Sequence, residues 1–133
     1  MKLKTLHLLP LTLLLISCDP PHYINFINTT KENTKVKINL QSNPWESAFT
    51  KFAIGDSIVF NLTTKDTATI NFGIGTWSDE EIKEVVKDIK SVEIETSEIK
   101  TIYKTHESIE KLLIENKKGM IGGWETEIRI EIE

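Results

Sequence analysis

Cys18 is the chain's only cysteine, and its thiol is the side chain with the most clearly defined chemical setting. It follows an apolar run over residues 8–16 and the small residue Ser17, while Lys2 and Lys4 precede that run. A positively charged start, a short apolar stretch and a small residue before a cleavage point together make an export signal. The run is too short for a transmembrane helix, which needs roughly 20 apolar residues. The setting therefore predicts cleavage near Cys18, and an ordinary secretory peptide would leave a free thiol there.

Residues 15–18, Leu-Ile-Ser-Cys, resemble the lipobox of bacterial lipoproteins, in which a signal peptidase cuts before a cysteine that is then acylated. The resemblance implies a signal peptide over residues 1–17 and lipid attachment at Cys18. A diacylglycerol would sit on the thioether and a third chain, of the palmitate type, on the amine. The resemblance further implies anchoring in the cell membrane or the outer membrane, with the folded part in the periplasm or at the cell surface. An aspartate directly after the acylated cysteine, as at Asp19, is a retention signal for the inner membrane in some enteric bacteria, but other lineages ignore it.

Length and charge limit the classes of partner. Loss of residues 1–17 would leave 133 − 17 = 116 residues, which fit one domain. We expect this domain over residues 23–133, joined to the lipid by a short tether over residues 18–22. The net charge is −4, and loss of Lys2 and Lys4 with the signal would make the mature chain more acidic. Nucleic-acid binding requires Lys and Arg to neutralise phosphates, so a nucleic-acid partner is not expected. Membrane attachment would depend on the lipid of Cys18.

Apolar and polar residues alternate along most of the chain after the tether, which is typical of strands with one solvated face. This pattern predicts strands over residues 23–28, 34–40, 51–54, 57–62, 67–77, 92–96, 99–104 and 124–132. Two segments instead have helical spacing, residues 79–88 and, more weakly, residues 107–115. Ser78 and Glu81 match a capping box for the first helix, and Gly119 suits the end of the second.

The fold class predicted is mainly β: an antiparallel two-sheet β-sandwich of seven or eight strands with one or two short helices. In outline this pattern resembles the immunoglobulin-like and transthyretin-like sandwiches of small lipoproteins. The inter-sheet cysteine pair of antibody domains is absent, so that subfamily is excluded.

No catalytic residue, cofactor or metal site is predicted. After the signal the only histidines are His22, expected in an exposed linker, and His106, expected as a solvated residue at a helix start. They are far apart and lack cysteine companions, so zinc spacing is missing. Residues 73–78 match half of a dinucleotide fingerprint, but the sixth position is Ser78 and no parallel βαβ unit surrounds it. A small hydrolase would need His106 to meet an acidic or hydroxyl partner in a cleft.

The tryptophans are the candidate binding residues. Trp45 follows Pro44 in a predicted loop, and Trp124 follows the pair Gly122-Gly123. Aromatic rings near loops can stack on sugars or anchor an interface, although they can equally plug the end of a sandwich. Trp45 and Trp124 are therefore predicted as possible binding residues, and Trp77 less so.

Four short motifs could mark glycosylation. Residues 56–58 and 66–68 resemble the Asp-Ser/Thr-apolar acceptor pattern for O-glycosylation in one bacterial phylum, with Ser57 and Thr67 as the acceptors. Both also read as plain turn-to-strand junctions. Asn28 and Asn61 begin eukaryotic N-glycan sequons, which a bacterial lipoprotein would usually ignore.

These observations favour a membrane-anchored cell-envelope lipoprotein whose non-catalytic β-sandwich binds or scaffolds a protein, a glycan or peptidoglycan. The alternative is an envelope inhibitor or immunity lipoprotein that neutralises a toxin or lytic enzyme. An acidic domain would suit a basic target through electrostatic steering.

Overall fold

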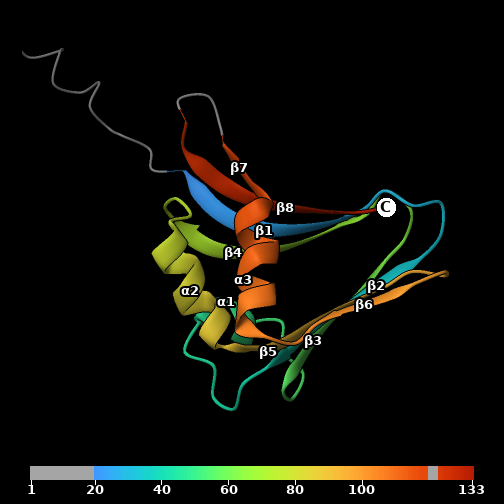
Figure 1. Ribbon diagram of the computed structural model, residues 1–133, viewed down its shortest axis with the longest axis horizontal. Helices are drawn as coiled ribbons and strands as arrows, with labels where there is room; N and C mark the ends of the chain where they lie inside the picture. The colour runs from blue at the N-terminus through green and yellow to red at the C-terminus, as the bar shows by residue number, and fades with distance from the viewer. Residues whose placement is uncertain (1–19, 120–122) are drawn as a thin grey trace, which may run out of the picture.

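Eight strands and three short helices make up the described part of the chain, residues 20–119 and 123–133 of a computed structural model (Figure 1). In chain order they are β1 (Pro21–Asn28), β2 (Thr34–Leu40), α1 (Ser47–Thr50), β3 (Ser57–Leu62), β4 (Thr67–Ile74), α2 (Asp79–Lys87), β5 (Ile89–Glu95), β6 (Lys100–Tyr103), α3 (His106–Glu115), β7 (Lys117–Gly119) and β8 (Glu125–Ile132). Cys18 and the predicted signal peptide lie outside the described residues.

The strands form two four-stranded sheets, which confirms the predicted mainly β sandwich. One sheet has the order β4-β1-β8-β7 and the other β3-β2-β5-β6. In Figure 1 they are the upper and lower layers, and α3 runs between them from the end of β6 to the start of β7. Consecutive strands often lie in different sheets, so the connections β1–β2 and β3–β4 both cross from one layer to the other.

One strand pair departs from the antiparallel prediction. β1 and β8 are parallel, with Ile24 opposite Ile128 and Phe26 opposite Ile130, whereas the other paired strands are antiparallel. Hairpin turns force antiparallel pairing, but β1 and β8 are far apart in the chain and no turn joins them. The direction of this pair is therefore decided by the whole topology.

The core lies between the inner faces of the sheets, as the alternation predicts. Phe26 of the upper sheet and Val36 of the lower sheet are both almost fully buried. The two long helices bury the stripes that their spacing predicts: Ile82, Val85, Val86, Ile109, Leu112 and Leu113. Full burial of one such apolar side chain contributes about 1.5–3 kcal/mol, so these stripes hold the helices against the sheets.

The strand predicted over residues 51–54 is wrong. Helix α1 precedes that segment, capped by Glu46, whose side chain accepts a hydrogen bond from the backbone N–H of Ala48. The helix buries Ala48 and Phe49, and residue 54 makes only an isolated bridge to Ser57 across a tight turn. A four-residue helix carries too little sequence periodicity to be recognised, which is why three helices form where one or two are predicted.

Several predicted element ends also move, and β5 for example begins at Ile89, whereas the sequence places its start at residue 92. The strand expected over residues 67–77 stops at Ile74, just before Gly75, which has a φ angle of 148°. Gly73, with a φ angle of 91°, lies inside the strand, where the pairing with β1 is irregular. Gly119 does not cap the second helix. Asn116 occupies the C-cap of α3, and Gly119 belongs to the short strand β7.

Candidate functional site

The root of the predicted tether is built into the upper sheet. β1 begins at Pro21, so the sandwich starts before residue 23, where the sequence places it. Pro21 pairs with Ile74, and the carbonyl oxygen of Pro20 accepts a hydrogen bond of 2.9 Å from the N–H of Gly75. A proline is tolerated at the first position of a strand, where its missing N–H costs no ladder bond. Any group attached to Cys18 is thus connected to a fixed point on the fold.

His22 is a buried residue, so its prediction as exposed linker is wrong. Only 3% of its surface is exposed, and its ring lies 4.6 Å from that of Trp77. Its Nε2 lies 2.8 Å from Oε1 of Glu81, and its Nδ1 lies 3.2 Å from the carbonyl oxygen of Gly73. Each ring nitrogen therefore lies within hydrogen-bond distance of an oxygen atom from another element. The histidine thereby ties β1 to β4 and to the first turn of α2.

This contact changes the role of Glu81. Ser78 caps α2 as predicted, since its side chain accepts a hydrogen bond from the N–H of Glu81. The other half of the predicted capping box is wrong, because the carboxylate of Glu81 bonds to His22 instead of returning a hydrogen bond to Ser78. The histidine has the same strand parity as Ile24 and Phe26, so extension of the alternation by one step would have placed it inside.

Lys117 forms a second clamp at the same end of the molecule. Its Nζ lies 2.8 Å from Oδ1 of Asp79 and 2.7 Å from Oε2 of Glu125, and its side chain is mostly buried. These hydrogen bonds, first to Asp79 and then to Glu125, raise the pKa of Lys117 above its usual value. The hydrogen bond from Lys117, and then its positive charge, lower the pKa of Asp79. One ammonium group therefore joins the start of α2 to the strands β7 and β8.

An apolar surface surrounds the tether root. It is lined by Pro20, Ile74, Gly75, Thr76 and Trp124 around a shallow hollow of about 420 Å³, and we call it the tether-end patch. Ile74 is 69% exposed and Trp124 is 52% exposed. Trp124 precedes β8 and does not join the strand that the sequence predicts from residue 124.

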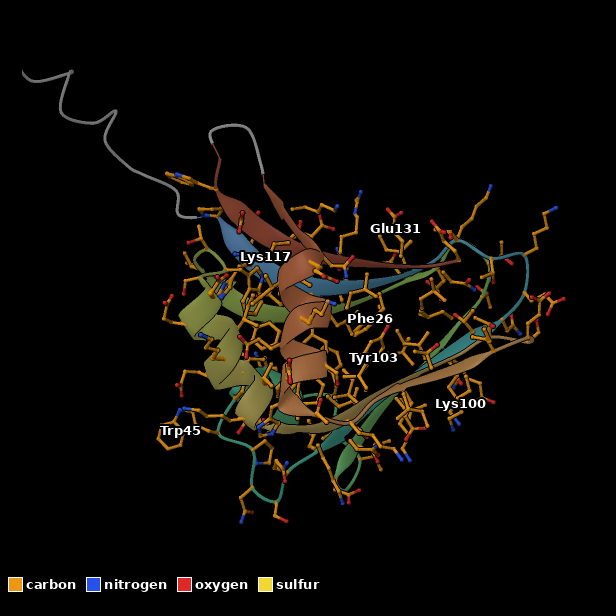
Figure 2. The ribbon with its side chains drawn as sticks, in the orientation of Figure 1. Phe26, Trp45, Lys100, Tyr103, Lys117 and Glu131 are labelled. Carbon is orange, nitrogen blue, oxygen red and sulfur yellow. The ribbon has the colours of Figure 1, made fainter. Side chains whose placement is uncertain are left out.

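Trp45 lies in a different place. It is 94% exposed, and Figure 2 shows it pointing away from the molecule at the lower left, whereas β1 begins at the upper left. A hollow of about 150 Å³ adjoins it, which we call the acidic hollow; it is lined by Trp45, Glu46, Glu81, Glu84, Val85, Lys87 and Asp88. The N–H of Glu46 donates a hydrogen bond of 2.6 Å to Oδ2 of Asp88, which holds the loop that carries the tryptophan.

The remaining candidates are scattered. His106 is exposed, as predicted, and makes no hydrogen bond or ion pair within the described ranges. Trp77 is buried, and its indole N–H donates to the carbonyl oxygen of Tyr23. Ser57 and Thr67 do begin strands, as the turn-to-strand interpretation predicts. Asn28 is wholly buried, so its side chain is inaccessible to a glycan.

The described residues contain neither a metal-binding cluster nor a membrane-spanning helix. Among residues 20–119 and 123–133, no group of three or more His, Cys, Asp or Glu side chains is arranged to hold a metal ion. The helices within those ranges are all too short or too polar to cross a bilayer.

A polar hollow of about 440 Å³ lies across the end of the lower sheet, lined by Asn33, Thr34, Lys35, Asn61, Leu62, Thr63, Glu95, Thr96 and Ser97. Its amides and hydroxyls can hydrogen-bond a polar ligand, but nothing in the sequence marks it. Its residues come from three strands and their turns, which only the fold brings together.

A scan against protein-family models, a search of the curated proteins and a search of the solved structures found no match.

Proposed function

We propose that this protein is a lipid-anchored component of a bacterial cell envelope whose β-sandwich binds a basic protein partner and carries out no catalysis. Cys18 supplies the anchor, and Trp45 with the acidic hollow supplies the binding surface. The lipobox-like residues 15–18 support the first part, and the chain enters the fold directly at Pro20.

One observation carries the binding role, namely the exposure of Trp45. A large aromatic side chain that is 94% exposed loses the free energy of burial in the isolated protein. Tryptophan is enriched among the residues that contribute most to protein interfaces. Because its loop is held by the hydrogen bond from Glu46 to Asp88, little ordering would be needed when a partner binds.

The charge around Trp45 favours a basic protein over the other partners considered. Four carboxylates and one lysine, Lys87, line the acidic hollow. Lys87 pairs with Glu84 at 2.6 Å and Glu81 bonds to His22, which leaves the carboxylates of Glu46 and Asp88 without a cationic partner among the described residues. A negative surface speeds the encounter with a positive partner and repels acidic ones. This observation also favours the second candidate function, an inhibitor or immunity lipoprotein directed at a basic lytic enzyme.

The anchor is tested by Cys18→Ala. We expect the wild-type chain in the membrane pellet and the variant in the soluble fraction, because the thioether lipid can no longer form. Mass spectrometry of the wild-type protein should show an acylated cysteine as its first residue. A variant that remains in the pellet, or an unmodified thiol, would contradict the anchor.

Binding is tested by Trp45→Ala. The immobilised domain should recover a basic protein from a detergent extract of the envelope in equal amounts. Truncation of a central tryptophan costs about 2 kcal/mol or more, so the variant should bind roughly thirtyfold more weakly. Ile54→Ala is the matched control, since Ile54 is 89% exposed and lies outside the acidic hollow. If Trp45→Ala and Ile54→Ala lose the same amount of binding affinity, Trp45 has no specific role in binding.

The two candidate functions differ in the partner. If the recovered protein is a lytic enzyme, titration with the domain should abolish its activity at one-to-one stoichiometry. If the recovered protein has no lytic activity, the binding or scaffolding function is favoured over the inhibitor function.

A further inference from the structure

We propose that the tether-end patch rests on the surface of the lipid bilayer and sets the orientation of the domain on the membrane. This inference rests on the proposed lipid anchor at Cys18 and assigns a second, non-covalent contact with the same membrane. It concerns the described residues Pro20, Ile74 and Trp124, with Gly75 and Thr76 between them.

The patch combines two exposed large apolar side chains. Single exposed apolar residues are common on soluble proteins, but here Ile74 and Trp124, 69% and 52% exposed, line one hollow. They come from the end of β4 and the approach to β8, the two strands that flank β1. The patch therefore surrounds the point at which the chain leaves the fold toward Cys18.

Only a short stretch of chain separates the proposed lipid on Cys18 from the patch. Cys18 precedes Pro20 by two residues, and an extended chain spans at most about 3.3–3.6 Å per residue. The Cα atom of Cys18 is thus held within roughly 7 Å of the Cα atom of Pro20, which lines the patch. Because the anchor would keep the patch close to the membrane, the effective concentration of the patch at the bilayer surface would be high. The patch would therefore need only a weak affinity for lipid.

The chemistry of the patch suits the headgroup region of a bilayer. Tryptophan is enriched at membrane interfaces, where its apolar ring meets the hydrocarbon and its N–H stays near water. Asp79 and Glu125 follow the patch closely in sequence, and anionic headgroups would repel their charges. Both carboxylates are paired with Lys117, at 2.8 and 2.7 Å, whose single positive charge offsets one of their two negative charges.

The test uses the full chain, purified with its lipid and reconstituted into phosphatidylcholine vesicles that contain lipid brominated close to the headgroup. In a Trp45→Phe variant the fluorescence comes from Trp124 and from Trp77, which is buried. We expect bromination to lower the Trp124 emission roughly twofold, because bromine quenches an indole at the interface. The matched control is Trp124→Phe, whose remaining Trp45 and Trp77 should keep their emission.

The outcomes separate the two proposals. A chain that fails to sediment with the vesicles contradicts the anchor. A chain that sediments but keeps its full Trp124 emission overturns the membrane contact and leaves the anchor intact. Emission that instead changes with protein density in vesicles without bromine would assign the patch to a second copy of the chain, and this too would overturn the inference.

Discussion

Asn28 shows how much one buried polar side chain can organise. Its amide nitrogen donates to the carbonyl oxygens of Glu32, Leu62 and Thr63, at 2.7, 3.1 and 3.0 Å. Its amide oxygen accepts from the backbone N–H and the hydroxyl of Thr30. These bonds join the β1–β2 connection to the end of β3, where the chain crosses between the sheets for the first and second time.

Replacement of Asn28 by alanine should destabilise the protein severely. Several carbonyl oxygens would be left without a donor in the interior, and each unsatisfied buried group costs about 1–3 kcal/mol. Urea unfolding should show a loss of about 2–4 kcal/mol, whereas Asn61→Ala, at an exposed position of β3, should change stability by less than about 0.5 kcal/mol. Equal effects of the two substitutions would show that the network contributes little.

At the scale of the element, the first turn of α2 serves the tertiary structure as well as the helix. Acidic residues in a first turn interact favourably with the positive end of the helix dipole. Here Asp79 also bonds to Lys117, and Glu81 to His22, so the same turn is fastened to β7 and β1. The helix start thereby holds the end of the sandwich at which the tether enters.

Lys117→Met should weaken this clamp in a pH-dependent way. The pKa of Asp79 lies below its ordinary value of 3.8, so its contribution to stability is complete above that pH and is lost as the pH falls through the lowered pKa. The pKa of Lys117 lies above 10.5, so its contribution is complete below that pH and is lost as the pH rises further. Wild type should therefore exceed the variant in free energy of unfolding at neutral pH, and this difference should shrink only as the pH falls below 3.8 and through the lowered pKa of Asp79.

Lys111→Met is the control for that comparison. Lys111 lies on the exposed face of α3 and reaches Glu115 at only 3.7 Å, and such surface pairs contribute little. Its removal should leave the pH dependence of unfolding unchanged. If the Lys117 variant had the same free energy of unfolding as the wild type at every pH, the ion pairs of Lys117 would contribute nothing to stability.

At the scale of the whole molecule, the two exposed tryptophans lie in different places. The tether-end patch carries Trp124 where β1 begins, and Trp45 projects from the opposite end of α2 (Figure 2). A domain that rests on the patch would therefore point Trp45 away from the membrane. The anchor would then present the acidic hollow to partners in the surrounding envelope.

This arrangement predicts that membrane attachment leaves Trp45 accessible. In the Trp124→Phe variant, iodide in the buffer should quench Trp45 equally well in detergent and in vesicles. In the Trp45→Phe variant, iodide quenching of Trp124 should fall once the protein is in vesicles. Protection of Trp45 by vesicles would reverse the proposed orientation.

Much of the local structure could be predicted from the sequence because its causes are local. Alternation along β2 and β8 follows from the two-residue period of a strand, and the helical stripes of α2 and α3 follow from the helical period. The exposed position of His106 and the cap at Ser78 depend on neighbouring residues alone. Helix α1 was missed because four residues cannot display a period, and its burial of Phe49 depends on the packed core.

The sequence by itself determined the alternating strands, the two amphipathic helices and the lipobox-like setting of Cys18, since each depends on neighbours along the chain. Only the tertiary structure decided the parallel pairing of β1 with β8, the burial of His22 against Glu81, and the gathering of Pro20, Ile74 and Trp124. These features join residues 50 to 110 positions apart, and no local preference specifies which distant strands meet. The topology of the two sheets specifies it, because burying both apolar faces at once leaves few ways to arrange the chain.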